Sequence, residues 1–221
     1  MEHEFWHERW SKKEIGFHEG SVNQFLYDHW PDLSGTGTGD NAESVFVPLC
    51  GKAHDMWWLH DRGHSVIGVE LSEIACKDFF EEAGEKAQVH PGKPFTIFRH
   101  DNLQLWCGDF FQLTPDDLKH TRLVYDRAAL IALPQSMRKD YVEHLTAILP
   151  EGTRILLITL DYNTRITAPP FNVSDEEVRE LYSADYNIEH ILTNTLPSDH
   201  MFTKRKGLIG ATESVFRLTK R

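Results

Sequence analysis

The chain has 221 residues, of which 40% are hydrophobic, and its formal net charge is −11. That length suits one medium-sized α/β domain, and the acidic balance argues against nucleic acid, because phosphate backbones repel such a chain. Apolar runs are short and interrupted by charge, and the acidic start lacks the pattern of a secretion signal. We therefore expect a cytoplasmic protein without a membrane segment. Three widely spaced cysteines predict reduced thiols and no zinc site.

The N-terminal part of the chain differs in pattern from the rest. Residues 2–30 are rich in aromatic residues and are predicted to be helical, with a break near residues 15–17. Residues 31–43 contain Gly-Thr-Gly-Thr-Gly and form the clearest linker in the chain. We therefore divide a single domain into an N-terminal helical segment with its linker, residues 1–43, and an α/β core, residues 44–221.

Predicted strands and helices alternate through the core. Short apolar runs bounded by turn residues predict buried strands at residues 45–49 and 65–69, with a helix at residues 53–62 between them. Ser72 and Ser174 are placed to cap two further helices, which end near residues 83 and 182. The other predicted elements are strands at residues 95–99, 103–106, 123–125, 154–160, 187–193 and 214–218 and a helix at residues 136–149. This alternation predicts a parallel, doubly wound sheet.

The ends of the first two predicted strands have the layout of a nucleoside-binding edge. Ligands of such sheets bind at the carboxyl ends of the strands. Gly51 follows the first strand and lets the backbone approach a ligand closely. Glu70 ends the second strand, where a carboxylate can accept both hydroxyls of a ribose. A solvated charge at a helix start is the alternative interpretation of Glu70. The absence of a full Gly-x-Gly-x-x-Gly disfavours a dinucleotide.

Two other motif matches do not suit their usual chemistry. The run His3-Glu4-Phe5-Trp6-His7 matches the H-E-x-x-H pattern of zinc proteases, but it lies at the start of the chain, where helices fray. Gly51-Lys52 resembles part of a Walker motif, but Ala53 follows and cannot bind magnesium. We therefore predict no metal site.

Several segments resemble the thiopurine S-methyltransferase family over nearly the whole chain. They are Phe5-Trp6-His7-Glu8-Arg9-Trp10, Ile15-Gly16-Phe17-His18, Val45-Phe46-Val47-Pro48-Leu49-Cys50-Gly51-Lys52, Gly68-Val69-Glu70-Leu71-Ser72, Tyr125-Asp126-Arg127-Ala128-Ala129-Leu130 and Pro169-Pro170-Phe171. The resemblance implies a Rossmann-like class I methyltransferase fold: a seven-stranded, mostly parallel sheet with an antiparallel last strand and helices on both faces. It also implies S-adenosylmethionine as cofactor, S-adenosylhomocysteine as product, and residues 1–43 as a lid.

The resemblance also implies roles for individual residues. Those implied to bind the cofactor are Trp10, Leu49, Glu70, Asp109, Phe110 and Arg127. Those implied to bind the methyl acceptor are Phe17, Arg122 and Arg127. As catalytic candidates we take Arg127, to orient the acceptor or the cofactor carboxylate, and Asp126, to accept a proton from less acidic acceptors. Residue type alone predicts neither Trp10, which would ordinarily be core, nor Arg127, which would ordinarily be a surface ion pair.

The implied reaction transfers a methyl group from a sulfonium to the sulfur of an aromatic or heterocyclic thiol such as 6-mercaptopurine. Methylation of selenium or tellurium species, which are also soft anions, is the alternative that the sequence leaves open. The missing glycines disfavour a nucleotide-dependent oxidoreductase, and the retention of Trp10, Glu70 and Arg127 disfavours a binding module without catalysis. We expect a monomer whose partner is a small-molecule acceptor, with no nucleic acid and no membrane.

Overall fold

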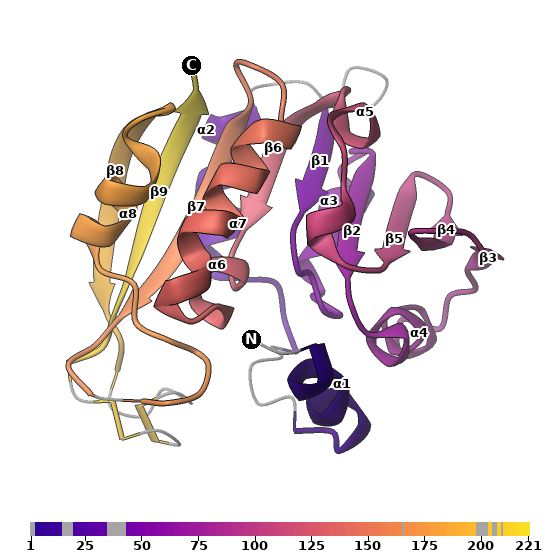
Figure 1. Ribbon diagram of the computed structural model, residues 1–221, viewed down its shortest axis with the longest axis horizontal. Coiled ribbons are helices and arrows are strands. Elements are labelled where there is room, and N and C mark those ends of the chain that lie inside the picture. Colours follow the sequence, from indigo (N-terminus) through magenta and orange to yellow (C-terminus); the bar gives the residue numbers. More distant parts are fainter. Residues whose placement is uncertain are drawn as a thin grey trace.

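Residues 3–14, 20–34, 43–164, 166–197, 203–204, 207–208 and 210–221 are described by a computed structural model, and they form nine strands in one mixed sheet (Figure 1). The strand order is β3-β4-β5-β2-β1-β6-β7-β9-β8. The strands are β1 (Ser44–Val47), β2 (Val66–Glu70), β3 (Gln88–His90), β4 (Thr96–His100), β5 (Leu103–Cys107), β6 (Thr121–Asp126), β7 (Arg154–Asp161), β8 (Tyr186–Thr195) and β9 (Thr212–Lys220). The helices are α1 (His3–Ser11), α2 (Gln24–Ser34), α3 (Asp55–Asp61), α4 (Glu73–Glu82), the 3-10 helix η2 (Phe110–Gln112), α5 (Pro115–Leu118), α6 (Ala129–Ala132), α7 (Gln135–Ile148) and α8 (Asp175–Tyr182).

The centre of the sheet is parallel and its two ends are antiparallel. Strands β5, β2, β1, β6 and β7 pair in parallel, whereas β4 runs against β5 and β9 runs against both β7 and β8. The predicted parallel core and antiparallel last strand are confirmed. The predicted number of seven strands is wrong, because β3 and β4 extend the edge beside β5. All of β3 is exposed, so no apolar alternation marks it in the sequence.

Alternate side chains of the central strands enter two apolar layers. On β7, Ile155 and Leu157 belong to a cluster with residues of α7 and α8, whereas Leu156 and Ile158 belong to a cluster with residues of α2, α3 and α4. This division follows from the two-residue repeat of a strand. Helices therefore cover both faces of the sheet, as predicted (Figure 1). None of the helices in the described ranges is long and apolar enough to cross a membrane.

The predicted serine caps explain where two helices begin. The Ser72 hydroxyl accepts a hydrogen bond from the amide of Ala75 at 3.4 Å, and α4 starts at the next residue. The Ser174 hydroxyl accepts one from the amide of Glu177 at 3.2 Å, at the start of α8. Each cap satisfies an amide that the first helical turn leaves without a partner. The start of α4 matters for function, because it directly follows the end of β2.

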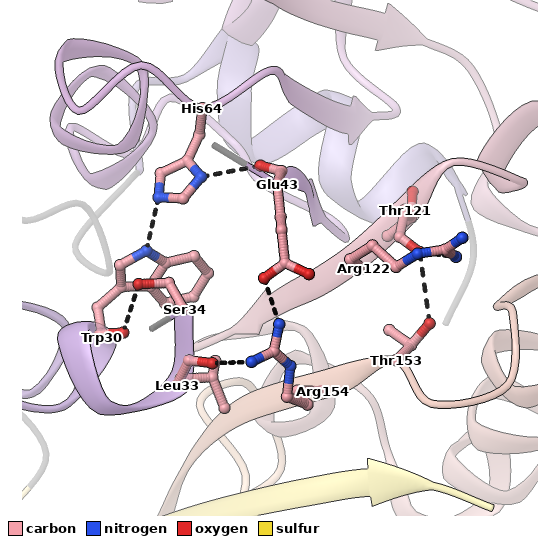
Figure 2. Close-up of polar contacts among 9 residues, drawn as sticks. All are labelled: Trp30, Leu33, Ser34, Glu43, His64, Thr121, Arg122, Thr153 and Arg154. Carbon is pink, nitrogen blue, oxygen red and sulfur yellow. Dashed lines mark hydrogen bonds and ion pairs between the residues drawn. The ribbon is translucent and has the colours of Figure 1, made fainter. Parts of the chain in front are cut away.

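A buried polar network binds α2 to the amino-terminal edge of the parallel strands (Figure 2). Trp30 on α2 donates from its indole nitrogen to Nε2 of His64 at 3.0 Å, and Nδ1 of His64 donates to the carbonyl of Glu43 at 2.8 Å. Arg154 forms an ion pair with Glu43 and also donates to the carbonyl of Leu33. Helix α2 therefore packs as part of the core layer, although it precedes residue 43.

Lowering the pH below about 6.5 should destabilise the protein through His64. Burial, helped by the charge of Arg62, lowers the pKa of His64 from its usual 6.5. A protonated ring would also turn a second N–H toward the Trp30 donor. The unfolded chain then binds the proton more tightly, so this stability is present above pH 6.5 and is lost as the pH falls. Urea unfolding at pH 7.5 and pH 5.5 should show a larger loss for the wild type than for His64→Gln. Equal losses would contradict this role.

Candidate active site

A pocket opens at the carboxyl edge of the parallel strands. Helix α1 lies beyond this edge of the sheet (Figure 1). In the order of the strands, its lining residues lie at or just after the ends of β5, β2, β1 and β6. Others lie near the end of β7 and at the start of β9. These residues are Asp109, Phe110, Glu70, Leu71, Leu49, Gly51, Arg127, Ala128, Ile158, Thr159, Leu160 and Glu213. The empty space of the pocket, counted together with its open mouth, is about 1300 Å³.

The sheet order separates two ends of this pocket. Neighbouring strands lie about 4.8 Å apart, so Glu70 on β2 and Leu160 on β7, three strands away, are separated by roughly 14 Å across the sheet. The end near Glu70 carries two carboxylates, Glu70 and Asp109. The end near Leu160 is walled mainly by apolar residues, among them Ile131, Pro169 and Pro170, but Glu213, which pairs with Leu160 in the sheet, also lines it. One pocket thus offers a polar end and an apolar end.

Glu70 is the buried carboxylate of the polar end. One of its oxygens accepts the amide of Gly51 at 3.0 Å, and the other accepts the amide of Ser72 at 2.7 Å. Burial raises the pKa of Glu70 to about 7, although hydrogen bonds from the amides of Ser72, Gly51 and Leu71 act in the opposite direction. The carboxylate therefore connects the turn after β1 with the turn after β2. The strand pattern predicted both turns at this edge of the sheet, but it did not predict a bond between them.

Asp109 and Phe110 complete the polar end. The Asp109 carboxylate accepts the amide of Phe111 at 3.0 Å and caps η2, and Nε2 of His3 on α1 lies 3.5 Å from its other oxygen. Phe110 is buried and stacks on Phe46 of β1. The His3 contact crosses from α1 to the turn after β5. Residues of α1 therefore reach the site from the N-terminal segment.

Trp10 meets the Gly51 turn in the middle of the pocket. Gly51 has a positive φ of 54°, and a Cβ added there would lie 3.3 Å from the Trp10 ring. Glycine is favoured here both because of this backbone conformation and because the indole lies so close. Leu49, also at positive φ, lines the same pocket. The structure thus brings Trp10 and Leu49, to which the resemblance gives cofactor roles, together with Gly51, while their binding roles stay predictions.

Arg127 and Asp126 follow each other at the end of β6 but lie in different environments. Arg127 lines the pocket, whereas Asp126 is completely buried and accepts the Tyr141 hydroxyl at 2.6 Å. Burial raises the pKa of Asp126 to about 6, opposed by hydrogen bonds from Tyr141 and from the start of α6. Asp126 is absent from the pocket lining, and Tyr141 lies between it and the pocket. The role of Asp126 as a proton acceptor therefore stays a prediction.

Arg122 does not reach the pocket. It lies near the start of β6, is exposed, and donates to the carbonyl of Thr121 at 3.3 Å (Figure 2). Five residues of extended chain separate it from Arg127, a distance of roughly 16 Å along the strand. The strand places the two arginines at opposite edges of the sheet, so Arg122 is not among the residues that this pocket brings together. The predicted acceptor residue Phe17 lies outside the described residues.

The apolar end contains residues for which no role was predicted from the sequence. Ile131 belongs to α6, a four-residue helix too short to show a helical repeat, and Leu160 belongs to β7. Pro169 and Pro170 are part of a recognised motif, but the motif alone does not show that they face a ligand. Tyr141 and Met137 on α7 also line the pocket. No group of three or more metal-ligating side chains was found within the described ranges.

Comparisons with known proteins agree on the family. The profile of the family described as thiopurine S-methyltransferase matches residues 1–221. Thiopurine S-methyltransferases of Marinobacter nauticus and Azotobacter vinelandii are 70% and 45% identical to this chain, and each match covers 100% of both chains. A Burkholderia thailandensis 1,6-didemethyltoxoflavin-N1-methyltransferase, solved with bound S-adenosylhomocysteine, shares the fold: the TM-score is 0.65 at 13% identity, over 99% of this chain and 86% of that one. The chain belongs to the thiopurine S-methyltransferase family and is a methyltransferase that uses S-adenosylmethionine.

Proposed function

We propose that this pocket transfers a methyl group from S-adenosylmethionine to the sulfur of an aromatic or heterocyclic thiol such as 6-mercaptopurine. The observation that carries the proposal is a continuous pocket with a polar end at Glu70 and a mainly apolar end at Leu160. It occurs in a chain 70% identical to a thiopurine S-methyltransferase over its full length. The polar end suits the nucleoside of the cofactor, and the apolar end suits a flat acceptor ring.

The residues present fit the cofactor. Each oxygen of Glu70 accepts one amide, and a carboxylate oxygen has room for a further hydrogen bond, here from a ribose hydroxyl. The Trp10 ring can hold a sulfonium by cation–π attraction, and Arg127 can bind a carboxylate in two hydrogen bonds. When bound, the cofactor supplies an electrophilic methyl group on a positively charged sulfur. Asp109 and Phe110 border the adenine in this arrangement.

The chain contributes mainly orientation and exclusion of water. The attacking form of a sulfur acceptor is the thiolate, and an acceptor that ionises near neutral pH needs no strong base. Ile131, Leu160 and Pro169 remove water from this anion, so that it is not stabilised by hydration. Arg127 directly follows β6, between the two ends, and orients the acceptor anion or the cofactor carboxylate. Alignment of the three reacting atoms then supplies much of the rate.

Helix α1 acts as a lid over the pocket in this proposal. Trp6 and Trp10 line the pocket, and His3 contacts Asp109 across its mouth. Helix α2 stays with the sheet. The free thiols of the three cysteines support a cytoplasmic location. The protein acts as a monomer in this proposal. The partner is a small-molecule acceptor.

Methyl transfer from labelled S-adenosylmethionine tests this function, with 6-mercaptopurine, thiophenol, selenite and tellurite as parallel acceptors. We expect transfer to the two thiols. Transfer to the oxyanions alone would favour the selenium and tellurium alternative. Tight binding of S-adenosylhomocysteine without transfer to any acceptor would contradict the proposal.

Two arginines on the same strand provide a matched pair of variants. Arg127→Ala should lower kcat/KM for 6-mercaptopurine by about 10- to 150-fold, the equivalent of a lost hydrogen bond between charged groups. Arg122→Ala should leave kcat/KM within about twofold, because that side chain is exposed at the other edge of the sheet. If Arg127→Ala and Arg122→Ala lowered kcat/KM equally, the reaction would not take place at the edge of the sheet where Arg127 lies.

A further inference from the structure

The apolar end of the pocket includes a wall that has few ways to anchor itself. Pro169 and Pro170 line the pocket, and proline has no backbone N–H with which to form a hydrogen bond. The next anchors in the chain are the amide of Phe171, which donates to the carbonyl of Ile131 at 2.7 Å, and the amide of Val173, which donates to the carbonyl of Leu160 at 2.8 Å. The two prolines therefore depend on their carbonyl groups or on packing.

The hydroxyl of Tyr162 anchors Pro170. It donates to the carbonyl of Pro170 at 2.6 Å. Tyr162 directly follows β7, and only 5% of its surface is exposed. Its ring packs with Leu160, Leu208 and Ala211, so its position is set by the ends of β7 and β9. A side chain at the end of β7 thereby holds Pro170 by a hydrogen bond.

We propose that Tyr162 is a positioning residue for the methyl acceptor, because its hydroxyl holds the Pro169–Pro170 wall at the distance from Ile131 that a flat acceptor requires. This inference rests on the proposed function of the same pocket. Tyr162 does not line the pocket and takes no part in the chemical step. It also lies at the β7 end, roughly 14 Å across the sheet from Glu70, so it should affect the acceptor and leave the cofactor alone.

Tyr162→Phe tests the inference, and Tyr186→Phe is its matched control. Tyr186 is also buried, and its hydroxyl accepts one hydrogen bond, from Thr146 at 3.2 Å, away from the pocket. Tyr162→Phe should raise KM for 6-mercaptopurine about three- to tenfold, as expected for one lost hydrogen bond, while Kd for S-adenosylhomocysteine stays within twofold. Amide exchange at Phe171 should also become faster. Tyr186→Phe should change neither KM nor this exchange.

The outcomes separate this inference from the proposed function. An unchanged acceptor KM in Tyr162→Phe, or equal changes in the two variants, would overturn the positioning role. If the wild type methylates no thiol, the proposed function fails, and Phe171 exchange then still reports whether Tyr162 holds the wall. Slow exchange in Tyr162→Phe, equal to that of the wild type, would overturn the inference in that case as well.

Discussion

Replacing Glu70 by glutamine should raise Kd for S-adenosylhomocysteine about 10- to 150-fold at pH 8. The two oxygens of Glu70 accept the amides of Gly51 and Ser72, so an amide group in place of one oxygen would turn N–H against N–H. The same change removes a charged acceptor for the ribose hydroxyls, and hydrogen bonds to charged groups are worth about 1.5–3 kcal/mol. Isothermal titration gives Kd directly. Glu73→Gln is the control, because Glu73 is an exposed residue near Glu70 that pairs only with Lys77.

The pH dependence of binding provides a second test of Glu70. Because burial raises its pKa to about 7, the carboxylate is lost as the pH falls through 7. Kd should then rise about tenfold per pH unit below 7 in the wild type and stay nearly constant in Glu70→Gln. The effect on folding has the opposite sign, because the folded protein binds this proton more tightly than the unfolded chain. The contribution of Glu70 to stability therefore falls as the pH rises from about 4.5 to about 7. A wild-type Kd that does not vary with pH would remove Glu70 from the ribose site.

Replacing Arg138 by methionine should lower the free energy of unfolding by about 3–5 kcal/mol. Arg138 on α7 is 3% exposed, and its Nη1 donates to both carboxylate oxygens of Glu177 on α8 at 2.7 Å. Its Nε also donates to the carbonyl of Leu133 at 3.0 Å, which fixes the turn between α6 and α7. Removal of the guanidinium leaves Glu177 as an uncompensated, mostly buried charge, and this is the source of the large penalty.

The neighbouring Lys139 provides a matched control on the same helix. Lys139 forms an ion pair with Glu143 in which both side chains are exposed to solvent. Lys139→Met should therefore change the free energy of unfolding by less than about 1 kcal/mol. Guanidinium unfolding at pH 7.5 measures both variants. If Arg138→Met were no more destabilised than Lys139→Met, the ion pair would not hold α7 and α8 together.

Local patterns predicted the elements whose physical cause is local. The apolar runs at residues 45–49 and 65–69 became β1 and β2, and Ser72 and Ser174 cap the helices that they were expected to cap. The elements that were missed lack such a signal. Strand β3 is fully exposed, and α6 has only four residues. Short elements of this kind form because their neighbours in the sheet or the pocket stabilise them.

The site was less predictable because it depends on contacts between distant segments. Glu70 and Gly51 were expected at one edge of the sheet, but their direct hydrogen bond appears only in the fold. Trp10 was placed by resemblance alone, since nothing in an aromatic-rich helix indicates contact with Gly51. Arg122 was also named by resemblance alone, and the direction of β6 places it at the edge of the sheet opposite Arg127. Tyr162 carried no sequence signal at all.

A crystal structure with S-adenosylhomocysteine bound is the most direct test of the two-ended pocket. The account predicts that both ribose hydroxyls donate to the carboxylate of Glu70 and that the homocysteine sulfur faces the wall formed by Ile131, Leu160 and Pro169. The reverse orientation, with the ribose at the Leu160 end, or a ligand bound outside this pocket would contradict it.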